Sequence, residues 1–136
     1  MIYLTRHEHF NAAHQLYNPT WSLEKNVEVF GKCANANWHG HNYELIITIK
    51  GEIDSGTGFL MDAKLLGKLI QEQVCEQLDH KNLNLDVPFM KDKLASTENL
   101  AIGIWKQLLP HLPSGIVLHC VKLYETPSIC VEYFGN

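Results

Sequence analysis

The sequence predicts an α+β fold, in which a four-stranded antiparallel sheet carries two helices on one face in the order ββααββ. The chain has 136 residues, the size of a single domain, which we expect to span residues 1–136. Strand-like runs stand near both ends of the chain, and two segments with apolar residues at helical spacing lie between them. Strands gathered around a block of helices are typical of an antiparallel sheet.

The first half of the chain predicts two strands separated by a long loop. Residues 3–13 begin as a strand of mixed polarity. Residues 18–38 have no clear period and are rich in Asn, so we expect an irregular loop that carries function. Residues 41–50 are rich in β-branched side chains and are followed by turn residues at 54–58, which is typical of a strand.

The middle of the chain predicts the two helices. Apolar residues recur at helical spacing over 63–78, and Asp62 can cap the start of this segment. A second helix is expected over about 97–109. Either Ser96 or Thr97 can cap it, because a hydroxyl oxygen accepts a hydrogen bond from the first turn.

Residues 116–125 and 129–134 complete the predicted sheet as two strands joined by a short turn. A four-stranded sheet with helices on one face leaves its other face exposed and its edges open. Exposed sheet faces and edges favour pairing with another chain. We therefore expect an oligomer.

Composition excludes several classes of protein. Apolar residues make up 46% of the chain and charged residues 19%, which is typical of a globular protein. Eleven basic residues against fifteen acidic ones give a net charge of −4, and Arg6 is the sole arginine, which argues against a nucleic-acid-binding surface. No apolar run approaches the ~20 residues of a membrane helix, and the first residues do not resemble a signal peptide. We expect a cytoplasmic protein whose four cysteines are free thiols.

Two His-x-His pairs are candidates for metal binding. His39 and His41 enter the second strand two positions apart, so their side chains point to the same side and can share a metal ion. A third ligand is needed, and we choose His14 because it ends the first strand, which an antiparallel pairing can bring beside the second. His7 and His9 should face away from His14 and are expected on an exposed strand face.

Three further positions have either a catalytic or an ordinary interpretation. Cys33 lies in the long loop beside a lysine; it is either a reactive thiolate or a small loop residue. Asp79 and His80 follow the first helix. They are either an acid–His proton relay or ordinary residues at the helix C-terminus, where a histidine interacts favourably with the helix dipole. Glu125 ends a strand, where it either accepts two hydrogen bonds from a ligand edge or is a surface acid.

Several segments, taken together in order, resemble motifs of the 6-pyruvoyltetrahydropterin synthase family. They are residues 10–14, 30–33 followed by 39–43, 78–83, 96–99 and 124–126. The Cys-x5-His-Gly-His and Leu-Asp-His-Lys-Asn-Leu elements are specific in combination. The resemblance runs from about residue 10 to the C-terminus.

The resemblance implies a fold, an assembly and a reaction. The fold is the tunnelling fold, whose subunits form trimeric barrels that stack in pairs as hexamers with active sites between subunits. The substrate is 7,8-dihydroneopterin triphosphate, which loses triphosphate and rearranges to the 6-pyruvoyl product. Zn²⁺ is implied as the cofactor, held by His14, His39 and His41.

The resemblance also implies roles for residues around the metal. Cys33 is similar to the family's general base, and Asp79 and His80 resemble its proton relay. The implied pterin pocket comprises three residues: Glu125, which is the anchor and takes part in the proton relay, and Thr97 and Glu98.

The chain departs from the family pattern at three points. Gln15 follows the first zinc histidine where Arg is frequent, and Trp38 stands where the family has Gly before His-Gly-His. Ser96-Thr97-Glu98 holds one hydroxyl fewer than the mammalian block.

The main alternative is 6-carboxytetrahydropterin synthase of the queuosine pathway, which typically has three residues between the Cys and the His-Gly-His; here five separate Cys33 from His39. A folate-pathway variant would need a Glu that 34–38 lacks. An inert zinc- or pterin-binding module would predict loss of Cys33 or of the Asp79-His80 pair.

Overall fold

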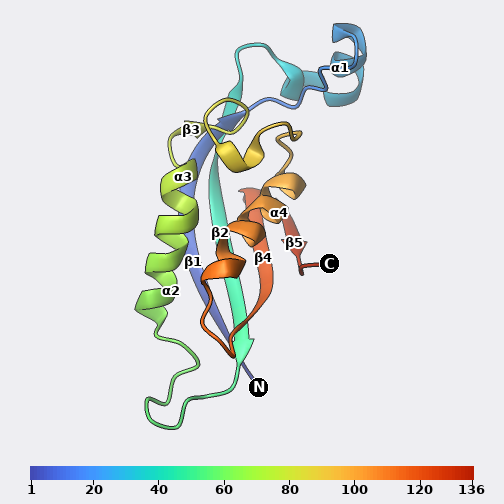
Figure 1. Cartoon of the computed structure of the whole chain (residues 1–136). Coiled ribbons are helices and arrows are strands. Elements are labelled where there is room, and N and C mark those ends of the chain that lie inside the picture. The colour runs from blue at the N-terminus through green and yellow to red at the C-terminus, as the bar shows by residue number, and fades with distance from the viewer.

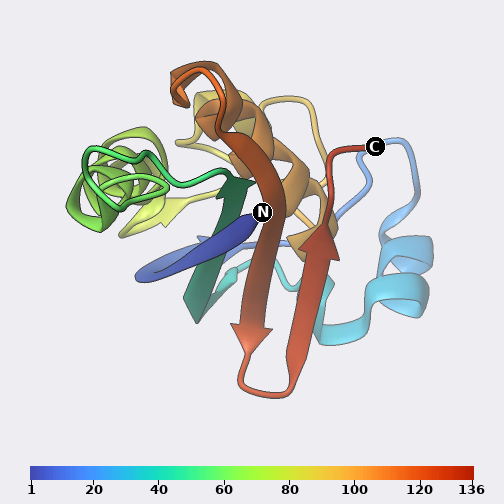
Figure 2. The same cartoon turned by 90° about the horizontal axis from the view of Figure 1, so that it is seen from below.

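The computed structural model describes all residues, 1–136, as one sheet with helices packed on one of its faces (Figures 1 and 2). The sheet order is β3-β1-β2-β4-β5. The strands are β1 (Ile2–His14), β2 (His39–Gly51), β3 (Lys81–Asn82), β4 (Val117–Thr126) and β5 (Ile129–Tyr133). The α+β class is confirmed.

The four long strands pair antiparallel, as predicted. The two-residue strand β3 is an addition to the predicted four-stranded sheet, and it pairs parallel to the end of β1. It pairs Lys81 with Ala12 and Asn82 with Ala13. So short a strand has no side-chain periodicity, and the sequence therefore gave no signal for it.

Both predicted helices are present. The first consists of α2 (Ala63–Ile70), a π-helical turn (Gln71–Cys75) and α3 (Glu76–Leu78) in unbroken succession. The second is α4 (Thr97–Leu108). The oxygen of Asp62 accepts from the backbone of Lys64 at 2.9 Å, and Ser96 rather than Thr97 caps α4 by accepting from Asn99 at 3.2 Å.

The core lies between the helices and one face of the sheet. Every second residue is buried from Phe10 to His14 on β1 and from Tyr43 to Gly51 on β2. The large, fully buried side chains are those of Tyr43, Leu45, Ile47, Ile49, Leu66, Ile70, Leu78, Leu83, Met90, Leu100, Ile104 and Leu108. His14, His39 and His41 continue this inner face beyond the core, at the end where β1 finishes and β2 begins.

Residues 18–38 are not wholly irregular, which corrects the expected loop. They contain α1 (Leu23–Phe30) and a 3₁₀ turn (Gly31–Ala34), and they project from one end of the sheet (Figure 1). Ser22 caps α1, and the fully buried Asn26 bonds to both backbone groups of Asn18. These local polar contacts, rather than an apolar face packed on the core, hold the helix.

All four cysteines are free thiols, as predicted. None of the helices combines the length and the apolar character that crossing a bilayer requires.

Candidate metal centre

The antiparallel pairing of β1 and β2 brings three histidines together. His14 lies directly opposite His39, and Ala12 lies opposite His41. The imidazole centroids are 4.5 Å apart for His14 and His39, 5.1 Å for His14 and His41, and 5.0 Å for His39 and His41. Each histidine offers one ring nitrogen, and these three nitrogens all lie within 4.8 Å of one another.

Each of these histidines has a buried ring nitrogen without a hydrogen-bond partner. The atoms are Nε2 of His14, Nδ1 of His39 and Nε2 of His41. Buried polar atoms are nearly always paired in folded proteins, so three unpaired nitrogens at one point need a partner that the chain itself does not provide. A cation held by nitrogen ligands satisfies all three at once, and imidazole suits zinc well.

Burial also keeps these rings in the form that binds metal. The pKa values of His14, His39 and His41 all lie below the ordinary histidine value, chiefly because burial disfavours the charged imidazolium. The neighbouring histidines lower them further, while Glu125 acts in the opposite direction. A neutral imidazole offers the lone pair that a metal requires.

Glu125 stands beside the histidines, at the end of β4. Its Oε1 atom is 3.4 Å from Nε2 of His14 and 3.3 Å from Nε2 of His41. Its side chain is about 20% exposed. The structure therefore brings Glu125 to the three candidate metal ligands.

Tyr43 completes the inner wall, and sequence reasoning did not single it out. It follows His39 and His41 at the same two-residue spacing, which was the available signal. Its ring stacks on Phe10 with centroids 4.9 Å apart, and its hydroxyl is buried without a hydrogen-bond partner. Burial raises its pKa, with a further contribution from Glu125.

Cys33 lies at the base of the projecting segment, in the 3₁₀ turn. Its side chain is half-buried, and its carbonyl oxygen accepts a 2.8 Å hydrogen bond from the backbone of Leu16, two residues beyond His14. Gln15 secures the same turn through a 2.8 Å bond from its amide to the carbonyl oxygen of Ala34. The turn that carries Cys33 is thus tied to the end of β1 that carries His14.

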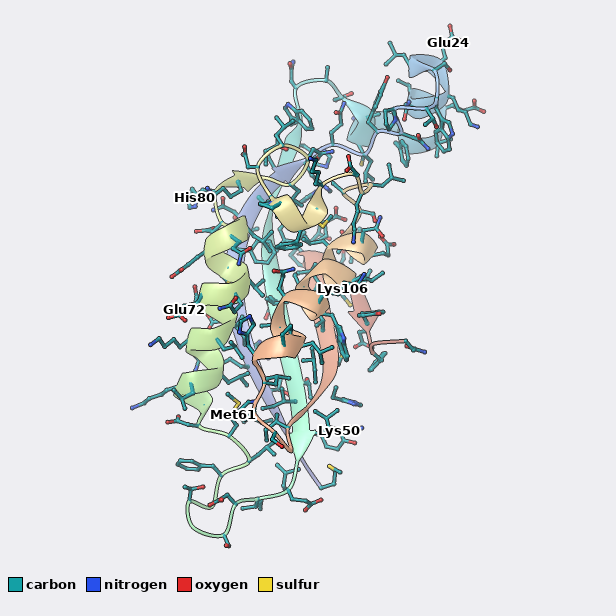
Figure 3. All side chains as sticks on the ribbon, viewed as in Figure 1. Glu24, Lys50, Met61, Glu72, His80 and Lys106 are labelled. Carbon is teal, nitrogen blue, oxygen red and sulfur yellow. The ribbon has the colours of Figure 1, made fainter.

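Asp79 and His80 contact each other and directly precede the edge strand β3 in the chain. Figure 3 labels His80. Asp79 Oδ2 is 2.9 Å from His80 Nδ1, and Asp79 Oδ1 accepts from the Asn11 backbone at 2.8 Å. The hydrogen bond from Asn11 is the main reason that the pKa of Asp79 lies below its ordinary value. A groove of about 550 Å³ has His80 and His41 among its walls. Within the chain, no hydrogen bond or ion pair joins Asp79 or His80 to the three histidines.

The segment before α4 contacts His14, one of the three candidate metal ligands. The carbonyl oxygen of Ala95 is 2.7 Å from Nδ1 of His14. Thr97 is buried at the start of α4, whereas Glu98 is exposed. Thr97 thus lies two residues after Ala95, whose carbonyl oxygen contacts His14, and Glu98 lies on the surface.

Comparison with known proteins agrees with this architecture. The profile of the family described as 6-pyruvoyl tetrahydropterin synthase matches residues 3–136. The chain is 47% identical over 133 residues to the 6-pyruvoyl tetrahydrobiopterin synthase of Pongo abelii and 46% to that of Homo sapiens, in both cases covering 98% of this chain and 91% of the relative. The 6-pyruvoyl tetrahydropterin synthase structure from Caenorhabditis elegans superposes with a TM-score of 0.92 at 37% identity, covering 99% of this chain and 96% of that one. The chain therefore belongs to the 6-pyruvoyl tetrahydropterin synthase family.

Proposed function

We propose that this single-domain protein is a zinc-dependent lyase that converts 7,8-dihydroneopterin triphosphate to 6-pyruvoyltetrahydropterin with elimination of triphosphate. The observation that carries the proposal is the meeting of three histidine nitrogens without partners at the β1–β2 end. The names of the relatives favour the pyruvoyl product over the carboxy product of the alternative enzyme. We place the enzyme in the cytoplasm, whose reducing environment suits four free thiols.

His14, His39 and His41 would hold the zinc ion. When bound, zinc supplies a Lewis acid that stabilises negative charge developing on the oxygens of the substrate side chain. The inner face of the sheet supplies an apolar floor beside the histidines, formed by the stacked rings of Phe10 and Tyr43. An apolar wall limits the access of water, which strengthens the electrostatic effect of nearby charges.

Cys33 is proposed as the general base that removes a proton from the substrate side chain. Asp79 and His80 would transfer protons on the opposite side of the substrate. The hydrogen bond from Asn11 holds the Asp79 carboxylate in place, and the carboxylate in turn orients the imidazole of His80. A carboxylate that fixes one ring nitrogen leaves the other free to exchange protons.

We further propose a homohexamer of two stacked trimers with active sites between subunits. Asp79 and His80 lie at an exposed sheet edge, with side-chain exposures of 42% and 77%. Such a position is suited to completing the site of a neighbouring subunit, because the pair makes no hydrogen bond or ion pair with the three histidines of its own chain. The open sheet edges favour the same association.

Glu125 is proposed as the pterin anchor and as a participant in the proton relay, with Thr97 and Glu98 contributing to the pterin pocket. A carboxylate can accept hydrogen bonds from both the 2-amino group and N3 of a pterin ring. The inward orientation of Glu125 supports a role at the reacting end of the site. The exposure of Glu98 fits a residue that would meet its ligand at a subunit boundary.

The experiment is product identification by mass after incubating zinc-loaded protein with 7,8-dihydroneopterin triphosphate. A 6-pyruvoyl pterin with free triphosphate is the expected result. A 6-carboxy pterin with acetaldehyde would overturn the proposed product while keeping the zinc and pterin sites. Unchanged substrate with fully zinc-loaded hexamer would overturn the proposed activity itself.

A further inference from the structure

Glu125 lies near the end of β4, on the side of the sheet that carries the three histidines. The β2–β4 register pairs Leu45 with Leu123 and Glu44 with Tyr124. Leu123 is fully buried on the inner face, and the pairing of β4 with β5 shifts register between Tyr124 and Thr126, which is at Glu125. The contacts of the carboxylate with His14 and His41 show that the Glu125 side chain lies on the inner face.

The contacts of Glu125 are close but are not hydrogen bonds. Its Oε1 lies 3.4 Å from Nε2 of His14 and 3.3 Å from Nε2 of His41, and both nitrogens are buried without a hydrogen-bond partner. Nδ1 of His14 faces the carbonyl oxygen of Ala95 and must therefore carry the ring hydrogen. Nε2 of His14 then presents a lone pair toward an oxygen that also carries lone pairs. A cation between the two atoms would turn this repulsion into attraction.

The distances are those of neighbouring ligands on one ion. For metal–ligand bonds of ~2.0–2.1 Å, any two ligands of a tetrahedral zinc ion lie about 3.3–3.4 Å apart. The contacts of Glu125 Oε1 with His14 and His41 have this spacing, whereas no ring nitrogen of His39 lies within 4.0 Å of the carboxylate. We propose that Glu125 supplies the fourth ligand of the metal centre in the enzyme that has no substrate bound. The resting centre then has three nitrogen ligands and one carboxylate oxygen.

This role has a consequence for substrate binding, which rests on the proposed function. Catalytic zinc sites keep one position open, whereas a site with four protein ligands is closed. Because Glu125 is also the proposed pterin anchor, the arriving pterin would draw the carboxylate away from the metal. The position for substrate oxygen would therefore open as the pterin binds, and Glu125 would exclude water from it beforehand.

The test uses Co²⁺, whose visible absorption bands report the number and type of its ligands. Wild type, Glu125→Gln and Glu44→Gln would be loaded with Co²⁺ in the absence of substrate, and affinities measured by competition with a chelator. Glu44 is a matched control, since it lies on the same sheet but bonds to His7 on the outer face. We expect Glu125→Gln to bind Co²⁺ at least about tenfold more weakly and to change its bands, since even outer-shell changes weaken metal sites 10–100-fold. Glu44→Gln should change neither.

Identical bands and affinity in wild type and Glu125→Gln would overturn the inference. A second variant, Glu125→Asp, keeps the charge but shortens the side chain, and it too should weaken binding; circular dichroism establishes that each variant is folded. His39→Ala removes one of the three proposed histidine ligands, so it shows how much Co²⁺ affinity is lost when a ligand is missing. The Co²⁺ measurement needs no substrate, so unchanged Co²⁺ spectra in Glu125→Gln would refute the ligand role alone, and a separate assay with substrate would test the proposed function. Failure of wild type to bind Co²⁺ or Zn²⁺ would refute both.

Discussion

Nδ1 of His14 and the carbonyl oxygen of Ala95 lie 2.7 Å apart, although 81 positions separate the two residues in the chain. A carbonyl oxygen only accepts hydrogen bonds, so the ring hydrogen of His14 is fixed on Nδ1 and the Nε2 lone pair faces His39 and His41. Ala95 immediately precedes Ser96, which caps α4. The orientation of one candidate metal ligand therefore depends on the correct start of a helix that lies far along the chain.

A pair of substitutions at His14 separates metal binding from this structural role. In His14→Asn the side-chain amide can still donate to the Ala95 carbonyl oxygen, whereas His14→Ala leaves that oxygen without its donor. Both variants should lose the metal, as measured by elemental analysis. In urea unfolding of the metal-free proteins, His14→Ala should be less stable than His14→Asn by about 1–2 kcal/mol, the typical effect of leaving a buried acceptor unpaired. Equal stabilities would show that the 2.7 Å contact contributes nothing.

The histidine cluster should make the metal-free protein sensitive to mild acid. Burial holds the pKa values of His14, His39 and His41 below the ordinary 6.5, so near that pH the unfolded chain binds protons that the folded chain does not. The stability contributed by the neutral rings is thus complete above pH 6.5 and is lost as pH falls from 6.5 toward the lowered values. Each histidine can contribute a slope of at most about 1.4 kcal/mol per pH unit.

Urea unfolding of metal-free protein between pH 7.5 and 5 measures this dependence. Asp79 does not interfere, because its lowered pKa makes stability change below 3.8 rather than near 6. His39→Ala is expected to show a shallower slope, since it has one fewer depressed histidine. Zinc present at one hundred times its dissociation constant should add about 2.7 kcal/mol at pH 7.5 and less at pH 5, where protons compete for the ligands. A flat profile for the metal-free protein would contradict the depressed pKa values.

The strands, the two main helices and the meeting of the three histidines followed from the sequence because each rests on a local period. His39 and His41 share a strand face, and His14 ends the strand that pairs with theirs. The support from Ala95 could not be predicted in this way, because a backbone carbonyl carries no residue-type signal and its contact spans 81 positions.

Two other features were missed for different reasons. The helix α1 is short and held by polar contacts of Ser22 and Asn26, so it lacks the apolar stripe that marks a helix packed on a core. The inward orientation of Glu125 could not be predicted from residue spacing within β4, because the residue lies where the pairing of β4 with β5 shifts register. Tyr43, in contrast, was predictable, because it follows His41 by two positions and must share the strand face of His39 and His41.

Replacing the Cys33 thiol should separate chemistry from structure. Cys33→Ala removes the proposed general base but leaves the backbone bond between Cys33 and Leu16, so the turn should be retained. We expect unchanged zinc content and unfolding, with turnover reduced about 10²–10⁴-fold, the range over which general bases act. Cys130→Ala is the matched control, because Cys130 is an exposed free thiol on β5 and should be silent. Turnover equal to wild type in Cys33→Ala would exclude the base role.

The buried hydroxyl of Tyr43 should lower stability in the metal-free protein. Its oxygen has no hydrogen-bond partner, and an unpaired buried polar group typically costs about 1–3 kcal/mol. Tyr43→Phe removes that group while keeping the ring that stacks on Phe10 at 4.9 Å. We expect the variant to be more stable than wild type by about 1 kcal/mol, seen as a higher urea midpoint with an unchanged slope.

The matched control is Tyr124→Phe, on the neighbouring strand, where the hydroxyl belongs to a half-buried residue and its loss should alter stability by less than about 0.5 kcal/mol. A stabilising Tyr43→Phe that also lowers turnover would mean that the hydroxyl is kept for the reaction at the expense of stability, as is common in active sites. A stabilising change with full turnover would leave the hydroxyl without a function. A destabilised Tyr43→Phe would contradict the unpaired hydroxyl and show that it bonds to a neighbour such as Glu125.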